Sequence, residues 1–219
     1  DLHPRVRRQR QMCIRDSEWI AHIKTLGGER KYVEPAKGTV NPRVFIDRLA
    51  KKMPANVTVV ADVGQNQIWT CTEYKFRKEG RLLTSGGMGT MGYSVPAAIG
   101  AKMADNSRAT VAICGDGAFQ MSFMELATAV QFGVDIKVVV MTNNRLGMVR
   151  ELQTNGYHDR QTAVFLDGSP DFIKLAEAYG IPAMRVYDDD TMEKGVEMLA
   201  EHKGICLVEV VVDKDMPTL

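Results

Sequence analysis

Stretches with the apolar spacing of helices alternate with short apolar runs typical of strands along most of the 219-residue chain. The runs around Val111, Val138 and Val208 are continuously apolar, which is what burial on both faces of a sheet requires. This alternation predicts the α/β class, with an open parallel sheet covered by helices on both faces. We expect strands over 57–61, 82–84, 110–114, 136–142, 183–187 and 205–212, and helices over 43–53, 67–74, 95–104, 122–132, 171–179 and 191–201.

The composition argues against two classes of partner. The longest apolar runs, 136–142 and 205–212, are far shorter than the roughly 20 residues that span a bilayer, so we expect no membrane segment. A formal net charge of +1 gives no reason to expect a nucleic-acid partner. The four cysteines are widely spaced, and Cys114 and Cys206 fall inside expected strands, which is typical of reduced, buried thiols. We therefore expect a cytoplasmic protein.

The chain divides into three parts. Residues 1–16 hold five Arg and two Asp without apolar periodicity and resemble translated sequencing-adaptor read-through. We interpret them as a non-native or disordered tail, with a basic targeting arm as the alternative. Residues 17–37 combine a helix, capped by Ser17 and ended by Gly27-Gly28, with a polar linker. They are interpreted as the end of a missing central domain, and residues 38–219 as the main domain.

Polar, glycine-rich loops follow the expected strands that end at Ala61, Cys114 and Thr142. Ligands of open parallel sheets bind beyond the carboxyl ends of the strands, so chemistry is expected in these loops. The loop Gly115-Asp116-Gly117 leads into an expected helix, where glycines and free backbone N–H groups favour a phosphate. An Asp would repel a phosphate unless a divalent cation lay between them. The alternative is an ordinary tight turn with an Asp cap.

Asn143 stands at the end of the next expected strand, 27 residues after Asp116. A helix and a strand fill that interval, so βαβ geometry returns Asn143 to the sheet edge that carries Asp116. One carboxylate, one amide oxygen and a loop carbonyl then converge. Water and two diphosphate oxygens could complete an octahedron suited to magnesium.

Gly115-Asp116-Gly117 followed by Asn143 resembles the signature of the thiamine diphosphate enzymes, and the resemblance covers about residues 37–213. It implies the thiamine diphosphate-binding fold, with thiamine diphosphate and Mg²⁺ as cofactors. It also implies that Mg²⁺ is bound by the side chains of Asp116 and Asn143 and by the backbone carbonyl of Arg145.

The same resemblance assigns further residues to the cofactor. Gly89 is implied to offer its carbonyl to the aminopyrimidine, and Met91 to be the apolar wedge that bends the cofactor into a V shape; these two are the candidate catalytic residues. For Met91 the alternative is core filler, and for the loop after Ala61 it is an ordinary turn with a polar cap. The other implied cofactor-binding residues are Val63, Gly64, Gln65, Asn66, Gly115, Asp116, Gly117, Ala118, Asn143, Gly147 and Met148.

Further sequence motifs indicate which group of thiamine diphosphate enzymes the chain resembles. The segments 84–87, 89–93, 147–149 and 171–176 together resemble the large catalytic subunits of acetolactate synthases. That resemblance implies a transferase of branched-chain amino acid biosynthesis, which decarboxylates pyruvate and joins the two-carbon unit to pyruvate or 2-ketobutyrate. Leu152 departs from the pattern, because many family members carry a Trp there in the acceptor pocket. The preference for the second 2-keto acid is therefore open.

The resemblance also implies partners. The parent protein is expected to bind FAD, to form a homodimer or homotetramer with the active site between subunits, and to take a small regulatory subunit. The family activates its cofactor with a Glu from an N-terminal domain that this sequence lacks, so we expect the 219-residue chain alone to be inactive.

Two other functions stay open. One is another carboligase or decarboxylase of the same family, such as glyoxylate carboligase or sulfoacetaldehyde acetyltransferase. The other is a non-catalytic nucleotide-binding module, against which the spacing of Asp116 and Asn143 counts. His158 lies near the loop expected to cover the site and is interpreted as a solvated loop residue.

Overall fold

The computed structural model describes residues 18–25 and 32–219 of the chain. Residues 18–25 are helical, as their apolar spacing predicts. Ser17, the Gly27-Gly28 pair and the predicted tail lie outside the described residues. The chain separates into two units at Tyr32 and Val33, and Val33–Leu219 is compact. None of the helices in the described ranges is both long and apolar enough to cross a membrane.

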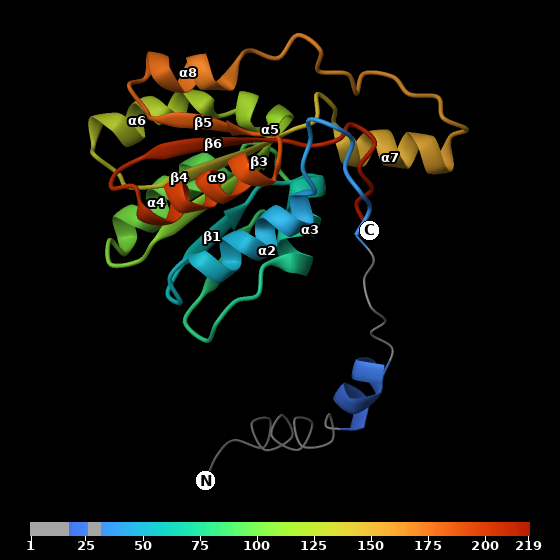
Figure 1. Cartoon of the computed structure of the whole chain (residues 1–219), viewed down its shortest axis with the longest axis horizontal. Coiled ribbons are helices and arrows are strands. Elements are labelled where there is room, and N and C mark those ends of the chain that lie inside the picture. The colour runs from blue at the N-terminus through green and yellow to red at the C-terminus, as the bar shows by residue number, and fades with distance from the viewer. Residues whose placement is uncertain (1–17, 26–31) are drawn as a thin grey trace. The chain divides into compact units, whose positions relative to one another are not determined.

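The compact unit is built on one six-stranded sheet in which every neighbouring pair of strands is parallel (Figure 1). Its strand order is β2-β1-β3-β4-β6-β5, which places β2 and β5 at the two edges. The predicted α/β class and the open parallel sheet are thus confirmed. The strands are β1 (Thr58–Ala61), β2 (Arg81–Thr84), β3 (Thr110–Gly115), β4 (Lys137–Thr142), β5 (Ala183–Val186) and β6 (Cys206–Val211).

Alternate strand residues enter two separate hydrophobic cores, one on each face of the sheet. Val111 and Val139 belong to the first core, with Trp69 of a covering helix, and Ala112 and Val138 belong to the second. Both cores are dry, which explains why the central strands are apolar at every position. The helices α2 (Pro42–Lys52), α3 (Gln65–Glu73) and α9 (Asp189–Glu201) supply the first core, and α4 (Ser94–Ala104), α5 (Asp116–Gln120), α6 (Leu126–Gln131) and α8 (Phe172–Ala178) supply the second.

Three helical predictions need correction. The prediction of one helix over 122–132 is wrong, because a 3-10 turn, η1 (Phe123–Glu125), precedes the shorter α6. The segment that begins with Asp116 was expected to be a loop but forms α5. Helix α7 (Gly147–Gly156) was not predicted at all. Its apolar residues Val149 and Leu152 are exposed, so α7 lacks the continuous buried apolar stripe by which a helix is recognised in a sequence.

The strand order creates a crevice at one edge of the sheet. The loop after β1 leads to α3 on the face of the first core, whereas the loop after β3 leads to α5 on the opposite face. Because β1 and β3 are neighbours, the two connections diverge from adjacent strand ends. Such a reversal is where open α/β sheets bind their ligands.

Candidate functional site

A cavity of about 100 Å³ lies in this crevice, beyond the carboxyl ends of β1, β3 and β4. It brings together all the predicted cofactor-binding residues except Gly89, and Arg145 as well. Segments 63–69, 115–118 and 141–149 make up most of its wall, and Met91 enters from a fourth segment. The loops after three strands therefore converge as the sequence predicts, although their individual roles remain predictions.

Asp116 is the buried anion of the cavity wall, with 2% of its surface exposed. Its Oδ1 accepts the Gly117 N–H at 2.8 Å, and its Oδ2 accepts those of Asn143 at 3.1 Å and Asn144 at 2.6 Å. Burial raises the pKa of this carboxyl to about 6, against the opposing effect of these hydrogen bonds. Among the described residues no basic side chain forms an ion pair with it.

Asn143 and Arg145 line the same cavity as Asp116, and their role as metal ligands stays a prediction. The Asn143 Oδ1 accepts the Arg145 N–H at 3.1 Å, so the turn holds this oxygen near the backbone of Arg145. The Arg145 guanidinium pairs with Asp167 at 2.7 Å and lies 4.7 Å from the ring centre of Phe165. That side chain is thereby engaged by Asp167 and Phe165.

Asn144 makes this turn possible. Its φ of 54° lies in the left-handed region, which Asn tolerates better than most residues. In this conformation its N–H reaches Asp116 while its carbonyl accepts the Leu166 N–H at 2.9 Å. The segment after α7 is thereby fixed against the strand ends.

Two glycines in the wall admit no side chain. Gly64 has a φ of 144°, and a Cβ there would lie 2.7 Å from the Asn66 Oδ1. A Cβ on Gly147 would lie 1.9 Å from the Gln65 Oε1. Backbone therefore approaches the cavity closely at both places, as an anion-binding loop requires.

Met91 lines the cavity, and Gly89 does not. A Cβ on Gly117 would lie 3.4 Å from the Met91 methyl group, so Met91 lies against the loop that carries Asp116. Gly89 is exposed, with a φ of 62° and no atom within 4 Å of an added Cβ. Its contact with an aminopyrimidine remains a prediction.

Asp62 positions the Met91 segment and was given no role in the sequence analysis. Its carboxylate is fully buried and accepts backbone N–H groups from Gly92 at 3.0 Å and Ser94 at 2.8 Å. Its Oδ1 also accepts the N–H of the neighbouring residue, Val63, at 2.9 Å. An acidic residue directly after the first strand was the available signal, because a charge there needs buried partners.

Helix α7 brings the predicted acceptor-pocket residue near the site without placing it in the wall. Leu152 is 61% exposed and does not line the cavity. His158 follows α7 and is exposed, as predicted. Its φ of 54° marks the left-handed turn that ends the helix segment.

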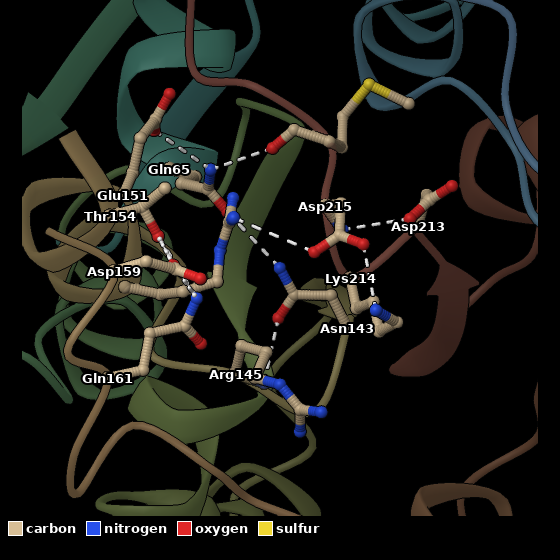
Figure 2. Close-up of polar contacts among 12 residues, drawn as sticks. Gln65, Asn143, Arg145, Glu151, Thr154, Asp159, Gln161, Asp213, Lys214 and Asp215 are labelled. Atoms are coloured by element: carbon tan, nitrogen blue, oxygen red, sulfur yellow. Dashed lines mark hydrogen bonds and ion pairs between the residues drawn. The ribbon is translucent and has the colours of Figure 1, made fainter.

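A segment after β6, residues 213–219, contacts two residues of the cavity wall, Gln65 and Trp69, and part of it is drawn in Figure 2. The Gln65 Nε2 lies 3.0 Å from the Met216 carbonyl oxygen and 3.1 Å from the Thr218 Oγ1. The Trp69 indole donates to the Pro217 carbonyl at 3.1 Å. No feature of the sequence predicted these contacts, because they join residues about 150 positions apart.

The donor set of the cavity fits a cation-bound diphosphate. Asp116 supplies a carboxylate that is desolvated yet unpaired by any side-chain cation, and Asn143 and Arg145 add neutral oxygens nearby. Hard cations prefer such oxygens. In the described part of the chain no three His, Cys, Asp or Glu side chains cluster in a way that suits a different metal.

Comparisons with known proteins bear on the same region. Residues 62–210 match the family described as thiamine pyrophosphate enzyme, C-terminal TPP binding domain. The chain is 39% identical to the mitochondrial acetolactate synthase catalytic subunit of Aspergillus candidus over 83% of this chain and 26% of that protein. It is 38% identical to the acetolactate synthase large subunit of Lactococcus lactis over 90% of this chain and 34% of that protein.

An archaeal protein gives a similar result. The probable acetolactate synthase large subunit of Methanocaldococcus jannaschii is 39% identical over 91% of this chain and 35% of that protein. The chain thus spans about a quarter to a third of the length of the curated relatives that it matches.

Proposed function

The chain belongs to the thiamine pyrophosphate enzyme family, whose C-terminal TPP-binding domain it contains, and we propose that this domain serves an acetolactate synthase. Its task is to hold the diphosphate end of thiamine diphosphate together with a magnesium ion. The support comes from the match over residues 62–210 and from the acetolactate synthase relatives.

Three residues would hold the magnesium ion: Asp116 and Asn143 through side-chain oxygens, and Arg145 through its backbone carbonyl. The backbone around Gly64 and Gly115 would face the diphosphate, because both glycines line the cavity without a side chain of their own. Bound thiamine diphosphate supplies the chemistry that decarboxylates a 2-keto acid and forms the new carbon–carbon bond. Met91 would support the bent form of the cofactor from its place in the cavity wall beside Gly117.

One observation carries the cofactor proposal: a buried carboxylate, Asp116, borders a cavity, and within the described part of the chain its hydrogen-bond partners are backbone N–H groups. A divalent cation would compensate both this charge and the diphosphate. The test is a calorimetric titration of thiamine diphosphate into the 219-residue chain at fixed Mg²⁺, for wild type and Asp116→Asn.

We expect Asp116→Asn to weaken cofactor binding by on the order of a hundredfold or more, because a first-sphere ligand is lost. Omission of Mg²⁺ should weaken wild-type binding to a similar degree. Glu193→Gln, which neutralises an exposed carboxylate of α9, is the matched control and should bind normally. Wild-type affinity in Asp116→Asn would contradict the assignment of this residue.

The proposed reaction joins a two-carbon unit from pyruvate to pyruvate or 2-ketobutyrate, which yields acetolactate or acetohydroxybutyrate. Leu152 is proposed to line the acceptor pocket in the complete enzyme, since α7 carries it next to the cavity wall. A product assay of the longer parent protein, with pyruvate alone, with 2-ketobutyrate and with glyoxylate, would identify the acceptor. A product from glyoxylate but none from pyruvate would favour the glyoxylate carboligase alternative.

The assembly is proposed from the same family membership. The parent would bind FAD in a central domain and would form a homodimer or homotetramer with active sites between subunits. A small regulatory subunit is proposed because relatives of this chain are named large subunits. We propose a cytoplasmic location in branched-chain amino acid biosynthesis, which fractionation of the source cells would test.

A further inference from the structure

Glu151 on α7 contacts the cavity only through another residue, Gln65. Its Oε2 lies 3.2 Å from the Gln65 Nε2, and its Oε1 accepts the Thr218 N–H at 3.1 Å. The Thr218 hydroxyl also donates to Oε2. A carboxylate accepts at both oxygens and donates at neither, so every partner of Glu151 must present a hydrogen.

Gln65 has two chemically different ends, and the structure uses both. Its Nε2 lies among three oxygens, those of Glu151, Met216 and Thr218, at 3.0 to 3.2 Å. Its Oε1 accepts the Asn143 Nδ2 at 3.2 Å. If the amide turned over, its oxygen would face the Glu151 carboxylate and the Met216 carbonyl, which cannot donate. These two acceptors therefore determine which way Gln65 faces.

The orientation of Gln65, together with the Arg145 N–H, determines that of Asn143 (Figure 2). Because Gln65 presents its oxygen, Asn143 must point its NH2 group toward Gln65 and its Oδ1 away, toward the Arg145 N–H. Gly147 is required for this contact, since a Cβ there would overlap the Gln65 Oε1. The hydrogen bonds thus run in one direction, from Asn143 through Gln65 to Glu151.

We infer that Glu151 is a positioning residue of the cavity: acting with the Met216 carbonyl and through Gln65, it fixes which atom of the Asn143 amide faces the site. The inference rests on the proposed function only for its consequence, which is that Asn143 presents oxygen rather than nitrogen to the cation. The hydrogen-bond direction itself depends on the free chain alone.

The experiment measures hydrogen exchange of the Asn143 side-chain amide by NMR in the ¹⁵N-labelled 219-residue chain, together with the Mg²⁺-dependent affinity for thiamine diphosphate. In Glu151→Gln the amide oxygen that keeps the Thr218 N–H bond turns the new NH2 group toward the Gln65 Nε2, so Gln65 retains only Met216 and Thr218 as acceptors. We expect Asn143 exchange to accelerate by about tenfold, the size expected for loss of one buried hydrogen bond. Cofactor affinity should fall in parallel.

Two controls separate positioning from simple attachment of the 213–219 segment. Thr218→Val removes the hydroxyl but keeps the backbone N–H and leaves the Glu151 carboxylate facing Gln65. Glu193→Gln neutralises an exposed carboxylate on α9. Both should leave Asn143 exchange within about twofold of wild type, because neither removes the acceptors that orient Gln65. Gln65→Met, which lacks both amide ends, serves as a second perturbing variant should Glu151→Gln not fold.

The outcomes are distinct. Unchanged Asn143 exchange in Glu151→Gln, or in Gln65→Met if that variant must replace it, would overturn the inference. Equal acceleration in Thr218→Val would overturn it too, because attachment of the segment would then explain the effect. If exchange responds as expected but the wild-type chain does not bind thiamine diphosphate with Mg²⁺, the positioning role stands and the proposed function fails.

Discussion

The two ends of the parallel strands carry buried charges of opposite sign. At the carboxyl ends, Asp62 and Asp116 accept hydrogen bonds from backbone N–H groups. At the amino ends, Lys102, Arg108 and Lys137 donate to backbone carbonyls. In βαβ connections helices begin beside the carboxyl ends of strands and finish beside the amino ends, so free N–H groups gather at one edge and free carbonyls at the other.

The carboxyl ends of the strands, called the acidic edge below, and the amino ends, called the basic edge, differ in how completely their buried charges are paired. The Lys137 ammonium donates to the His202 carbonyl at 2.8 Å and the Gly204 carbonyl at 2.5 Å, and it pairs with Asp135. All three of its hydrogens have partners. Asp116, by contrast, borders a cavity and has no cationic partner among the described side chains. Similar backbone chemistry thus stabilises the fold at one edge and leaves a binding site at the other.

The largest expected effect tests whether the acidic edge is only part of an active site. We expect no acetolactate from the isolated chain with pyruvate, Mg²⁺ and thiamine diphosphate, because Asp116 is the one carboxylate among the described residues that line the cavity, and we propose it for the magnesium ion. Addition of a supplied N-terminal portion of an acetolactate synthase should give turnover. Clear turnover by the chain alone would show that the cavity is a complete site.

A second prediction concerns shape at the same edge. In the full-length parent, Met91→Ala should reduce turnover by about a hundredfold while cofactor affinity changes by less than about threefold, because positioning is lost and the diphosphate anchor remains. Steady-state kinetics and a cofactor titration on the same preparation separate the two quantities. Collapse of affinity with intact turnover would exclude the wedge role.

A substitution at the basic edge should change the stability of the fold rather than cofactor binding. Lys137→Met leaves two carbonyls without a donor and should lower the free energy of unfolding by about 2 kcal/mol, with unchanged cofactor affinity. Urea denaturation of the 219-residue chain measures this loss. Lys194→Met, at an exposed position of α9, is the matched control and should stay within about 0.5 kcal/mol of wild type. A larger effect of Lys137→Met on cofactor affinity than on the free energy of unfolding would contradict this distinction between the two ends of the strands.

The smallest effect is a pH dependence at the basic edge. Burial raises the pKa of Cys206, the first residue of β6, to about 11 from an ordinary value of 9.0, while the nearby Lys137 charge lowers it. A folded pKa above the unfolded one means that this stability is present below pH 9 and is lost as pH rises toward 11. At pH 10 the loss should be about 1 kcal/mol. Cys206→Ala, which cannot ionise, should lack this component when both proteins are compared at pH 8 and pH 10.

Sequence reasoning succeeded where a residue type has one physical explanation. Continuous apolar runs such as the one around Val138 required a doubly covered parallel sheet, and that sheet brought Asp116 and Asn143 to one edge. It failed where the explanation lies in distant partners. Glu151 and Thr218 look like ordinary polar residues until their contacts with Gln65 are known. Helix α7 escaped prediction because two of its apolar residues, Val149 and Leu152, are exposed and leave no continuous buried stripe.

The contact between Gln65 and Thr218 spans 153 positions of the chain. Closing so long a loop costs more conformational entropy than closing the local turns around it, unless the sheet between the two residues has already formed. This part of the cavity wall is therefore among the last parts to assemble. A partly folded chain can possess its central strands and still lack a finished pocket, so cofactor uptake would report the end of folding rather than its beginning.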